Sequence, residues 1–339
     1  MKIQKIIAAF TLALLAVNAC KKDEAVDTKG YLTGTLEFAY PKYVAKGDSV
    51  YFKPSKVPAH PENGMISYSW KVTPGMEKDT TSLSADLGFG YRFRHDTTGT
   101  FTIACTASPA GDYYSTTTSN YVTIVEKGYK GTLPLETNAQ DSLWVYEGNT
   151  YAATKIGGKY WMRSNLAAHK SKDGSQDIGV GYLNYEVMKD VFGCYYTWEE
   201  AIKACPSGWH LPTDEEWTEM AKSVKPGQVS EIPTAFKTWK KVAGEMTCYY
   251  KLNSIDMIPL QADVKITDNS RLSVKMLGYA NNGKYFKMFN QQAFFWTASE
   301  DSDNNQMAWC RYFIFNKADV YAEPMNKKDF CAQVRCVKD

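Results

Sequence analysis

The sequence lacks most of the short motifs by which catalytic sites are recognised. Only four histidines occur in 339 residues, and none has a second histidine at the spacing of a zinc site. Gly-x-Ser-x-Gly, phosphate-loop and dinucleotide-binding patterns are also missing. We therefore expect a protein that is not an enzyme and that has no cofactor.

An excess of charge of one sign is missing as well. The chain has 39 basic and 37 acidic residues, and removal of residues 1–19, which hold two lysines and no acid, makes the two numbers equal. Nucleic-acid binding calls for a basic surface and a high isoelectric point. No nucleic-acid partner is expected.

No apolar run is long enough to span a bilayer comfortably, which takes about 20 residues. The N-terminal run, Ile6 to Val17, contains one threonine and follows Lys2 and Lys5, a layout typical of a secretory signal. Residues 17–20, Val-Asn-Ala-Cys, resemble the lipobox of bacterial lipoproteins. The resemblance implies cleavage after residue 19 and a diacylglycerol on Cys20. The alternative is an ordinary signal with a chance cysteine at the cut.

Residues 20–30 are the expected lipidated tether. Cys20 is followed by Lys-Lys-Asp-Glu, with no aspartate directly after the cysteine. A lysine followed by acids resembles the surface-export signal of Bacteroidota lipoproteins, which implies a lipid-anchored protein of the outer membrane that faces the extracellular side. The alternative is a solvated charged tether.

The chain has eight cysteines. Lipidation of Cys20 leaves seven, so at least one thiol is unpaired. Disulfides persist in oxidising compartments outside the cytoplasm, so pairs are plausible among the others.

Residues 31–127 show the pattern of an all-β domain. Segments such as Ile66–Val72 alternate apolar and polar residues with period two, which favours a β-sandwich. Trp70 is predicted in its core, and Cys105 is predicted to be a buried free thiol. The run Gly99–Ser108, together with Tyr68-Ser-Trp70, resembles a PKD-like immunoglobulin-type module, which implies a spacer or sometimes a sugar binder.

After a linker at residues 128–140, residues 141–339 are predicted to be an α+β domain. Thr197 with Glu200, and Thr213 with Glu216, have the spacing of capping boxes for two helices. Helical spacing defines their expected buried faces: Trp198, Ala201, Ile202 and Cys205 in the first, and Trp217, Met220, Ala221 and Val224 in the second.

Five segments of this domain carry a family pattern: residues 155–162 (KIGGKYWM), 165–166 (NL), 205–217 (CPSGWHLPTDEEW), 295–300 (FWTASE) and 334–339 (VRCVKD). They resemble the Fibrobacter succinogenes major paralogous domain of Bacteroidota surface lipoproteins. The resemblance spans about residues 141–339 and implies a fold like those of C-type lectins and formylglycine-generating enzymes. Leu252 to Phe289 departs from the family pattern, so no site there is carried over.

The same resemblance implies a disulfide framework. Cys205 would pair with Cys336, as in the lectin bridge between the first helix and the last strand. A second pair would be Cys310 with Cys331. Cys194 and Cys248 either pair or stay free.

One acidic loop has part of the sequence pattern of a calcium site. Asp301, Asp303 and Asn305 alternate as at the start of an EF-hand loop. The sixth position is Gln306 instead of glycine, and the twelfth is Tyr312 instead of glutamate, so the pattern fails. Calcium binding is possible but unsupported, and no metal site is predicted.

Aromatic residues are the best functional signal, at 14% of the chain with 23 Tyr and 9 Trp. Sugar rings stack on aromatic faces while their hydroxyls need polar partners. The motif tryptophans Trp161, Trp198, Trp209 and Trp217 are interpreted as core. Packing is the alternative for each aromatic candidate in the later part. The candidate glycan-binding residues are Trp239, Tyr249, Tyr250, Tyr285, Phe286, Trp296, Asp303 and Asn305.

These observations predict a non-catalytic, cell-surface glycan-binding lipoprotein that assists polysaccharide capture at the outer membrane. Its expected partners are a polysaccharide or oligosaccharide, the outer membrane through the lipid, and an outer-membrane glycan importer complex. The alternative is a surface adhesin or structural protein that binds protein partners.

Overall fold

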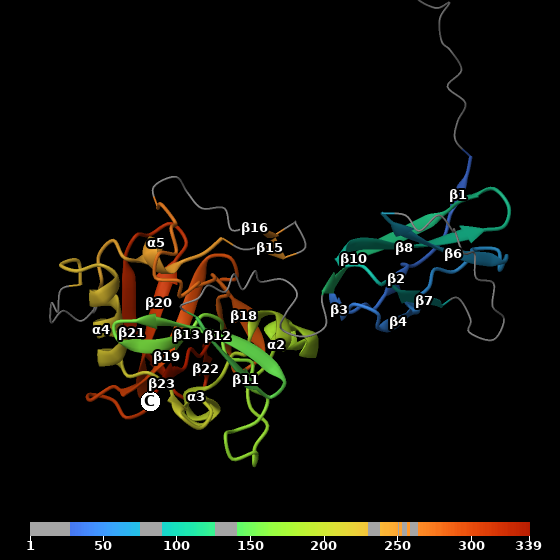
Figure 1. Ribbon diagram of the computed structural model, residues 1–339. Helices are drawn as coiled ribbons and strands as arrows, with labels where there is room; N and C mark the ends of the chain where they lie inside the picture. The colour runs from blue at the N-terminus through green and yellow to red at the C-terminus, as the bar shows by residue number, and fades with distance from the viewer. Residues whose placement is uncertain are drawn as a thin grey trace, which may run out of the picture.

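The computed structural model describes residues 28–74, 90–125, 141–229, 238–249, 251–252, 256–257 and 264–339. Two β-rich lobes follow one another along the chain (Figure 1). The predicted signal at residues 1–19, Cys20, the tether up to residue 27, the linker at residues 128–140 and Tyr250 lie outside the described residues. Within the described residues, no helix has the length and apolar character needed to cross a bilayer.

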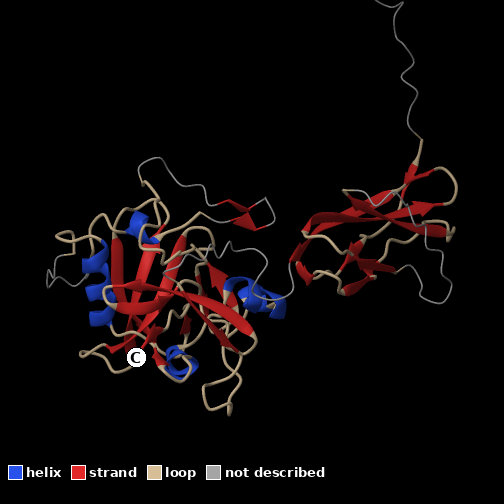
Figure 2. Ribbon diagram, viewed as in Figure 1, coloured by secondary structure: helices blue, strands red, loops and turns tan. Residues whose placement is uncertain are grey.

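The first lobe is built from strands alone in its described part (Figure 2). Its main sheet has the order β3-β10-β8-β6, which are Tyr43–Ala45, Thr116–Val125, Gly99–Pro109 and Ile66–Thr73. Three further strand pairs complete the lobe: β4 (Ser49–Phe52) with β7 (Tyr91–Arg94), β2 (Glu37–Phe38) with β5 (Pro54–Lys56), and β1 (Gly30–Tyr31) with β9 (Tyr113–Tyr114).

The core of this lobe follows from the period-two patterns. Alternate residues of β6 and β8 are buried, among them Trp70, which is 4% exposed. Cys105 lies opposite Trp70 in the β6–β8 register and is a fully buried free thiol, as predicted. Phe52 and Phe93, from the β4–β7 pair, pack into the same cluster. Burial raises the pKa of the Cys105 thiol to about 11.

The second lobe is α+β, with helices around a set of sheets (Figure 2). The largest sheet has the order β11-β12-β13-β23-β14, which are Ser142–Tyr146, Asn149–Ile156, Lys159–Met162, Val337–Lys338 and Trp209–His210. The other sheets are β19-β20-β21 (Gln292–Glu300, Met307–Ile314, Val320–Asn326), β18-β17-β22 (Tyr285–Lys287, Tyr279–Asn281, Phe330–Cys331) and β15-β16 (Lys251–Leu252, Asp256–Met257). The helices are η1 (Tyr182–Asn184), α2 (Glu186–Phe192), α3 (Trp198–Ala204), α4 (Asp214–Val224) and α5 (Ala243–Met246).

Both predicted capping boxes are present. Thr197 caps α3 and Thr213 caps α4, and each exchanges hydrogen bonds with the glutamate three residues later. The expected face of α4 is buried at Trp217, Met220 and Ala221. The face expected for α3 was partly wrong, because this two-turn helix rests on the small residues Ala201 and Ala204 and leaves Ile202 39% exposed.

Buried arginines hold the second lobe together. Arg335, which is fully buried, donates to Asn165 Oδ1 at 2.7 Å and to the Leu272 carbonyl at 2.6 Å. Arg311 donates to Asp214 Oδ1 at 2.6 Å. Because a buried charge needs a partner, each arginine fixes segments from distant parts of the chain around it.

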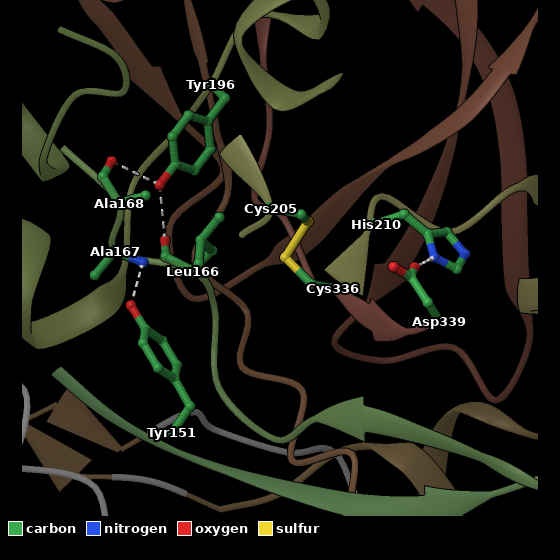
Figure 3. The surroundings of a disulfide bond; sticks show 9 residues. All are labelled: Tyr151, Leu166, Ala167, Ala168, Tyr196, Cys205, His210, Cys336 and Asp339. Carbon is green, nitrogen blue, oxygen red and sulfur yellow. Dashed lines mark hydrogen bonds and ion pairs between the residues drawn. A yellow bond between two sulfur atoms is a disulfide. The ribbon is translucent and has the colours of Figure 1, made fainter. Parts of the chain in front are cut away.

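One disulfide closes most of the second lobe (Figure 3). Cys205, directly after α3, is bonded to Cys336, directly before β23, with 131 residues of separation. Next to the bond, the Tyr196 hydroxyl donates to the carbonyls of Leu166 at 3.2 Å and Ala168 at 2.9 Å (Figure 3). The covalent link joins the helix end to the last strand.

The second bridge that the resemblance implied is not formed. Cys310 and Cys331 are free, as are Cys194 and Cys248. Cys310 belongs to one hydrophobic cluster, where its Sγ faces the Phe295 carbonyl, whereas Cys331 belongs to another. The β-sheets between the clusters therefore keep the two thiols apart.

Tyrosines join the two lobes. Tyr43 of the first lobe packs edge-on against Tyr185, with ring centroids 5.6 Å apart, and contacts Tyr182 in the same way. The Lys42 amide donates to the Tyr185 hydroxyl at 2.9 Å. The contact lies where β3 meets α2, so the first lobe is in contact with the second and is not only tethered to it.

Candidate functional site

A surface groove of about 580 Å³ opens where three segments of the second lobe meet. These segments are the start of α3, the loop between β19 and β20, and the turn between β21 and β22. Its lining combines one indole, amides, carboxylates and lysines: Trp198, Glu199, Asn305, Gln306, Asn326, Lys327, Lys328 and Asp329.

Lys327 joins the segments that form the groove. Its ammonium forms an ion pair with Glu300, donates to the Asn305 carbonyl at 2.7 Å, and lies 4.5 Å from the centroid of the Trp198 ring. Its backbone joins the same segments, because its amide donates to the Gln306 carbonyl and its carbonyl accepts from the Trp198 amide, both at 3.0 Å. One residue thus connects all three segments.

Trp198 forms the half-buried wall of the groove. It is the first residue of α3, and its indole Nε1 donates to the Thr297 carbonyl at 2.9 Å. The rest of the ring packs against the cluster around the disulfide. The interpretation of Trp198 as core was therefore only partly right. The sequence contained a signal for this location. Trp198 follows the predicted cap Thr197, so it is the first residue of the helix and lies at the end of the element.

The β19–β20 loop uses some of its polar side chains to hold its own shape. Asp301 Oδ1 accepts from the Asp303 amide at 3.3 Å, and Asn304 Oδ1 accepts from the Gln306 amide at 3.0 Å. On the facing turn, Asn326 Oδ1 accepts from the amides of residues 328 and 329. These local bonds keep both loops in turn conformations.

Other side chains of the groove remain available to a ligand. Within the part of the chain that the structure describes, no side-chain hydrogen bond is made by Glu199, Asn305, Gln306, Lys328 or Asp329, and all five residues are exposed. The groove therefore presents both donors and acceptors to solvent around a fixed frame.

Trp239 and Trp296, two of the predicted glycan-binding residues, are not available to a ligand. Trp239 is 2% exposed and Trp296 is fully buried, and they belong to different hydrophobic clusters. Arg311 covers the Trp239 ring at 4.1 Å, and the indole of Trp296 donates to the Tyr196 carbonyl at 2.8 Å. Both tryptophans are structural.

The other predicted residues are scattered. Asn305 lines the groove, and Asp303 is exposed in the same loop. Tyr249 and Tyr285 are 59% and 64% exposed, but neither lines the groove. Phe286 is half-buried against Tyr182 and Tyr195.

A second polar cluster surrounds His210, in the family motif. Its Nδ1 is 2.5 Å from Asp339 Oδ1, and its Nε2 is 3.0 Å from the carboxylate of Glu216, which also pairs with Lys159 (Figure 3 shows the His210–Asp339 contact). Burial alone raises the pKa of Glu216, but hydrogen bonds from Lys159, the Thr213 amide and His210 outweigh it and lower that pKa. The cluster ties α4 to the chain end, as expected for a structural histidine.

No metal centre is formed in the described ranges, which hold no group of three or more His, Cys, Asp or Glu side chains suited to a metal ion. In the β19–β20 loop, Asp301 Oδ1 accepts a hydrogen bond from the Asp303 amide instead.

The fold and the groove define a β-rich, multidomain protein with a polar surface site on a disulfide-closed α+β lobe. The chain belongs to the Fibrobacter succinogenes major domain family, whose family model matches residues 154–338. None of the curated proteins matches the chain.

One solved structure with a match is a quinonprotein alcohol dehydrogenase-like protein from Bacteroides thetaiotaomicron. It shares 10% identity at a TM-score of 0.20, over 85% of this chain and 61% of that chain. A likeness at this level carries no argument about fold or function.

Proposed function

We propose that this protein is a non-catalytic, cell-surface glycan-binding lipoprotein whose binding site is the groove beside Trp198. One observation carries the proposal: five exposed polar residues, whose side chains make no hydrogen bond within the described residues, surround a half-buried indole. In this proposal the second lobe is lectin-like, and the first lobe is a PKD-like spacer.

The chemistry of the groove suits sugar hydroxyls. Each hydroxyl both donates and accepts, and the amides of Asn305 and Gln306 offer both functions from one side chain. The carboxylates of Glu199 and Asp329 accept only, and charge-assisted bonds of this kind are the stronger ones. Because Lys327 already fixes the three segments, little ordering of the site is required when a ligand binds.

The environment of the carboxylates supports binding without catalysis. A glycosidase needs a general acid that stays protonated near neutral pH, and an apolar pocket is what keeps a carboxyl in that state. Glu199 and Asp329 are exposed instead. Their exposed oxygens are placed to accept hydrogen bonds from a ligand.

The proposed setting is the outer face of the outer membrane. A lipid on Cys20 would hold the first lobe near the membrane, and the second lobe would present the groove beyond it. Polysaccharide caught there would be passed to an outer-membrane glycan importer complex, the proposed partner.

The test is affinity gel electrophoresis and calorimetry of the mature chain on a panel of polysaccharides. The double variant Asn305→Ala/Gln306→Ala should weaken binding by about tenfold, because two hydrogen-bonding side chains are lost. Gln291→Ala is the matched control, since it removes an exposed glutamine at the opposite end of β19 and should change affinity less than about twofold. Absence of retention on every polysaccharide would refute the proposal.

A second candidate function is a surface adhesin or structural protein with protein partners. β11 is an edge strand of its sheet in the described part of the chain, and its outward residues Leu143 and Val145 are 59% and 64% exposed. An exposed apolar edge is a template for a strand of another protein. Co-purification of a partner from intact cells, lost in Val145→Lys with glycan binding unchanged, would favour this function.

A further inference from the structure

We propose that the groove selects uncharged glycans and excludes anionic ones such as uronate- or sulfate-bearing chains; this inference rests on the proposed function. It follows from which charges of the groove are already neutralised and which face solvent.

Lys327 is not available to an anionic ligand. Its side chain is only 12% exposed, and its ammonium already has Glu300, the Asn305 carbonyl and the Trp198 ring as partners. A compact ammonium has three donors, and these contacts use the directions open to it. Its positive charge therefore stabilises the folded protein and is not available to bind an anionic group of a ligand.

The remaining charges around the groove are mostly negative. Glu199 and Asp329 line it, and Asp301 and Asp303 lie in the loop that forms its rim. Among the described residues of the groove, Lys328 supplies the one ammonium that faces solvent. Neither Lys328 nor any of the four carboxylates forms an ion pair with another described residue. The local field is therefore negative although the mature chain is neutral overall.

The two ligand classes respond oppositely to this field. A neutral sugar brings hydroxyl donors to the carboxylates, as they require. The carboxylate of a uronate, or a sulfate group, offers only acceptors and has the same sign of charge as the carboxylates of the groove. Each close contact of this kind lowers affinity about fivefold at low salt. Salt screens such repulsion but has little effect on hydroxyl–carboxylate bonds.

The test uses the mature chain with neutral probes (xyloglucan, galactomannan, laminarin) and anionic probes (polygalacturonate, chondroitin sulfate). We expect binding to at least one neutral probe, with an affinity that changes less than about twofold between low salt and about 0.5 M NaCl. Every anionic probe should bind at least about tenfold more weakly at low salt.

The variant Glu199→Gln/Asp329→Asn should lower this neutral-to-anionic affinity ratio about tenfold, because it removes both facing charges. The control Asp177→Asn/Glu219→Gln changes the net charge equally at two exposed sites outside the groove and should leave the ratio unchanged. Anionic probes that bind as tightly as neutral ones, or a ratio that the groove variant does not lower, would overturn the inference while the proposed function stands. Loss of all binding to all probes would overturn both.

Discussion

At the residue scale, Lys327 and Lys328 are neighbours with different roles. Lys327 is nearly buried and joins three segments, whereas the side chain of Lys328 is exposed on the groove wall. Lys327→Met should lower the free energy of unfolding by about 1 kcal/mol, because the ion pair, the carbonyl bond and the contact with the indole are lost together. Urea titration followed by tryptophan fluorescence measures this change.

Lys328→Met provides the matched control, since it removes the same charge one residue away. Its free energy of unfolding should stay within about 0.5 kcal/mol of the wild type. Equal losses of stability in the two variants would contradict the role given to Lys327.

Glu216 makes stability depend on pH. Its pKa is lowered in the folded protein, so it contributes stability above its unfolded value of 4.5, and this contribution is lost as the pH falls through the lowered folded value. Glu216→Gln should therefore be less stable than wild type at pH 7, with the difference shrinking below about pH 4.5. Urea midpoints of both proteins at several pH values measure this. A difference that is constant with pH would show that the charge of Glu216 has no part in it.

The tryptophans show what could not be predicted at this scale. Trp198 was interpreted as core and lines the groove, whereas Trp239 and Trp296 were proposed for the site and are buried. Sequence neighbours indicate whether a segment is apolar or polar. They do not indicate which distant residue covers a ring, as Arg311 covers Trp239.

At the scale of elements, local hydrogen bonding predicts local structure. The capping box of α4 tests this directly: Thr213→Ala should destabilise the protein by about 1 kcal/mol, because the amide of residue 216 loses its acceptor. Thr213→Ser keeps the hydroxyl and should differ from wild type by less than half of that amount. Chemical denaturation measures both, and an alanine variant as stable as the serine variant would argue against the cap.

Strands and caps were predictable for the same reason. Alternation in β6 and β8, and the spacing of Thr197 with Glu200, depend on residues close in the chain. The groove depends on segments about 100 residues apart, which Lys327 and its partners bring together. Only Asn305 was predicted among its lining residues, because contacts at that separation follow from topology and not from local pattern.

At the scale of the whole molecule, the disulfide closes a loop with 131 residues of separation. In the chain-entropy model, a loop of that length contributes about 5 kcal/mol to stability. Reductant should therefore lower the thermal midpoint of the wild type but not that of Cys205→Ala/Cys336→Ala. Differential scanning fluorimetry with and without reductant measures this, and a wild type that does not respond would mean that the bond adds nothing to stability.

The position of β11 also sets how the protein would respond to mechanical load. With the proposed lipid on one side and a ligand in the groove on the other, tension would first act on the contact between Tyr43 and Tyr185. It would then reach β11 through Asp141, which is paired with Arg163 and Arg271. Ser142 pairs with Ala153 at the open end of the β11–β12 hairpin, so pulling there breaks hydrogen-bonded pairs one after another. The loops of the groove that carry Asn305 and Asp329 lie inside the covalent loop from Cys205 to Cys336. Once those contacts part, the edge strand would peel before the part closed by the disulfide opens, which would lengthen the tether while the ligand stays bound.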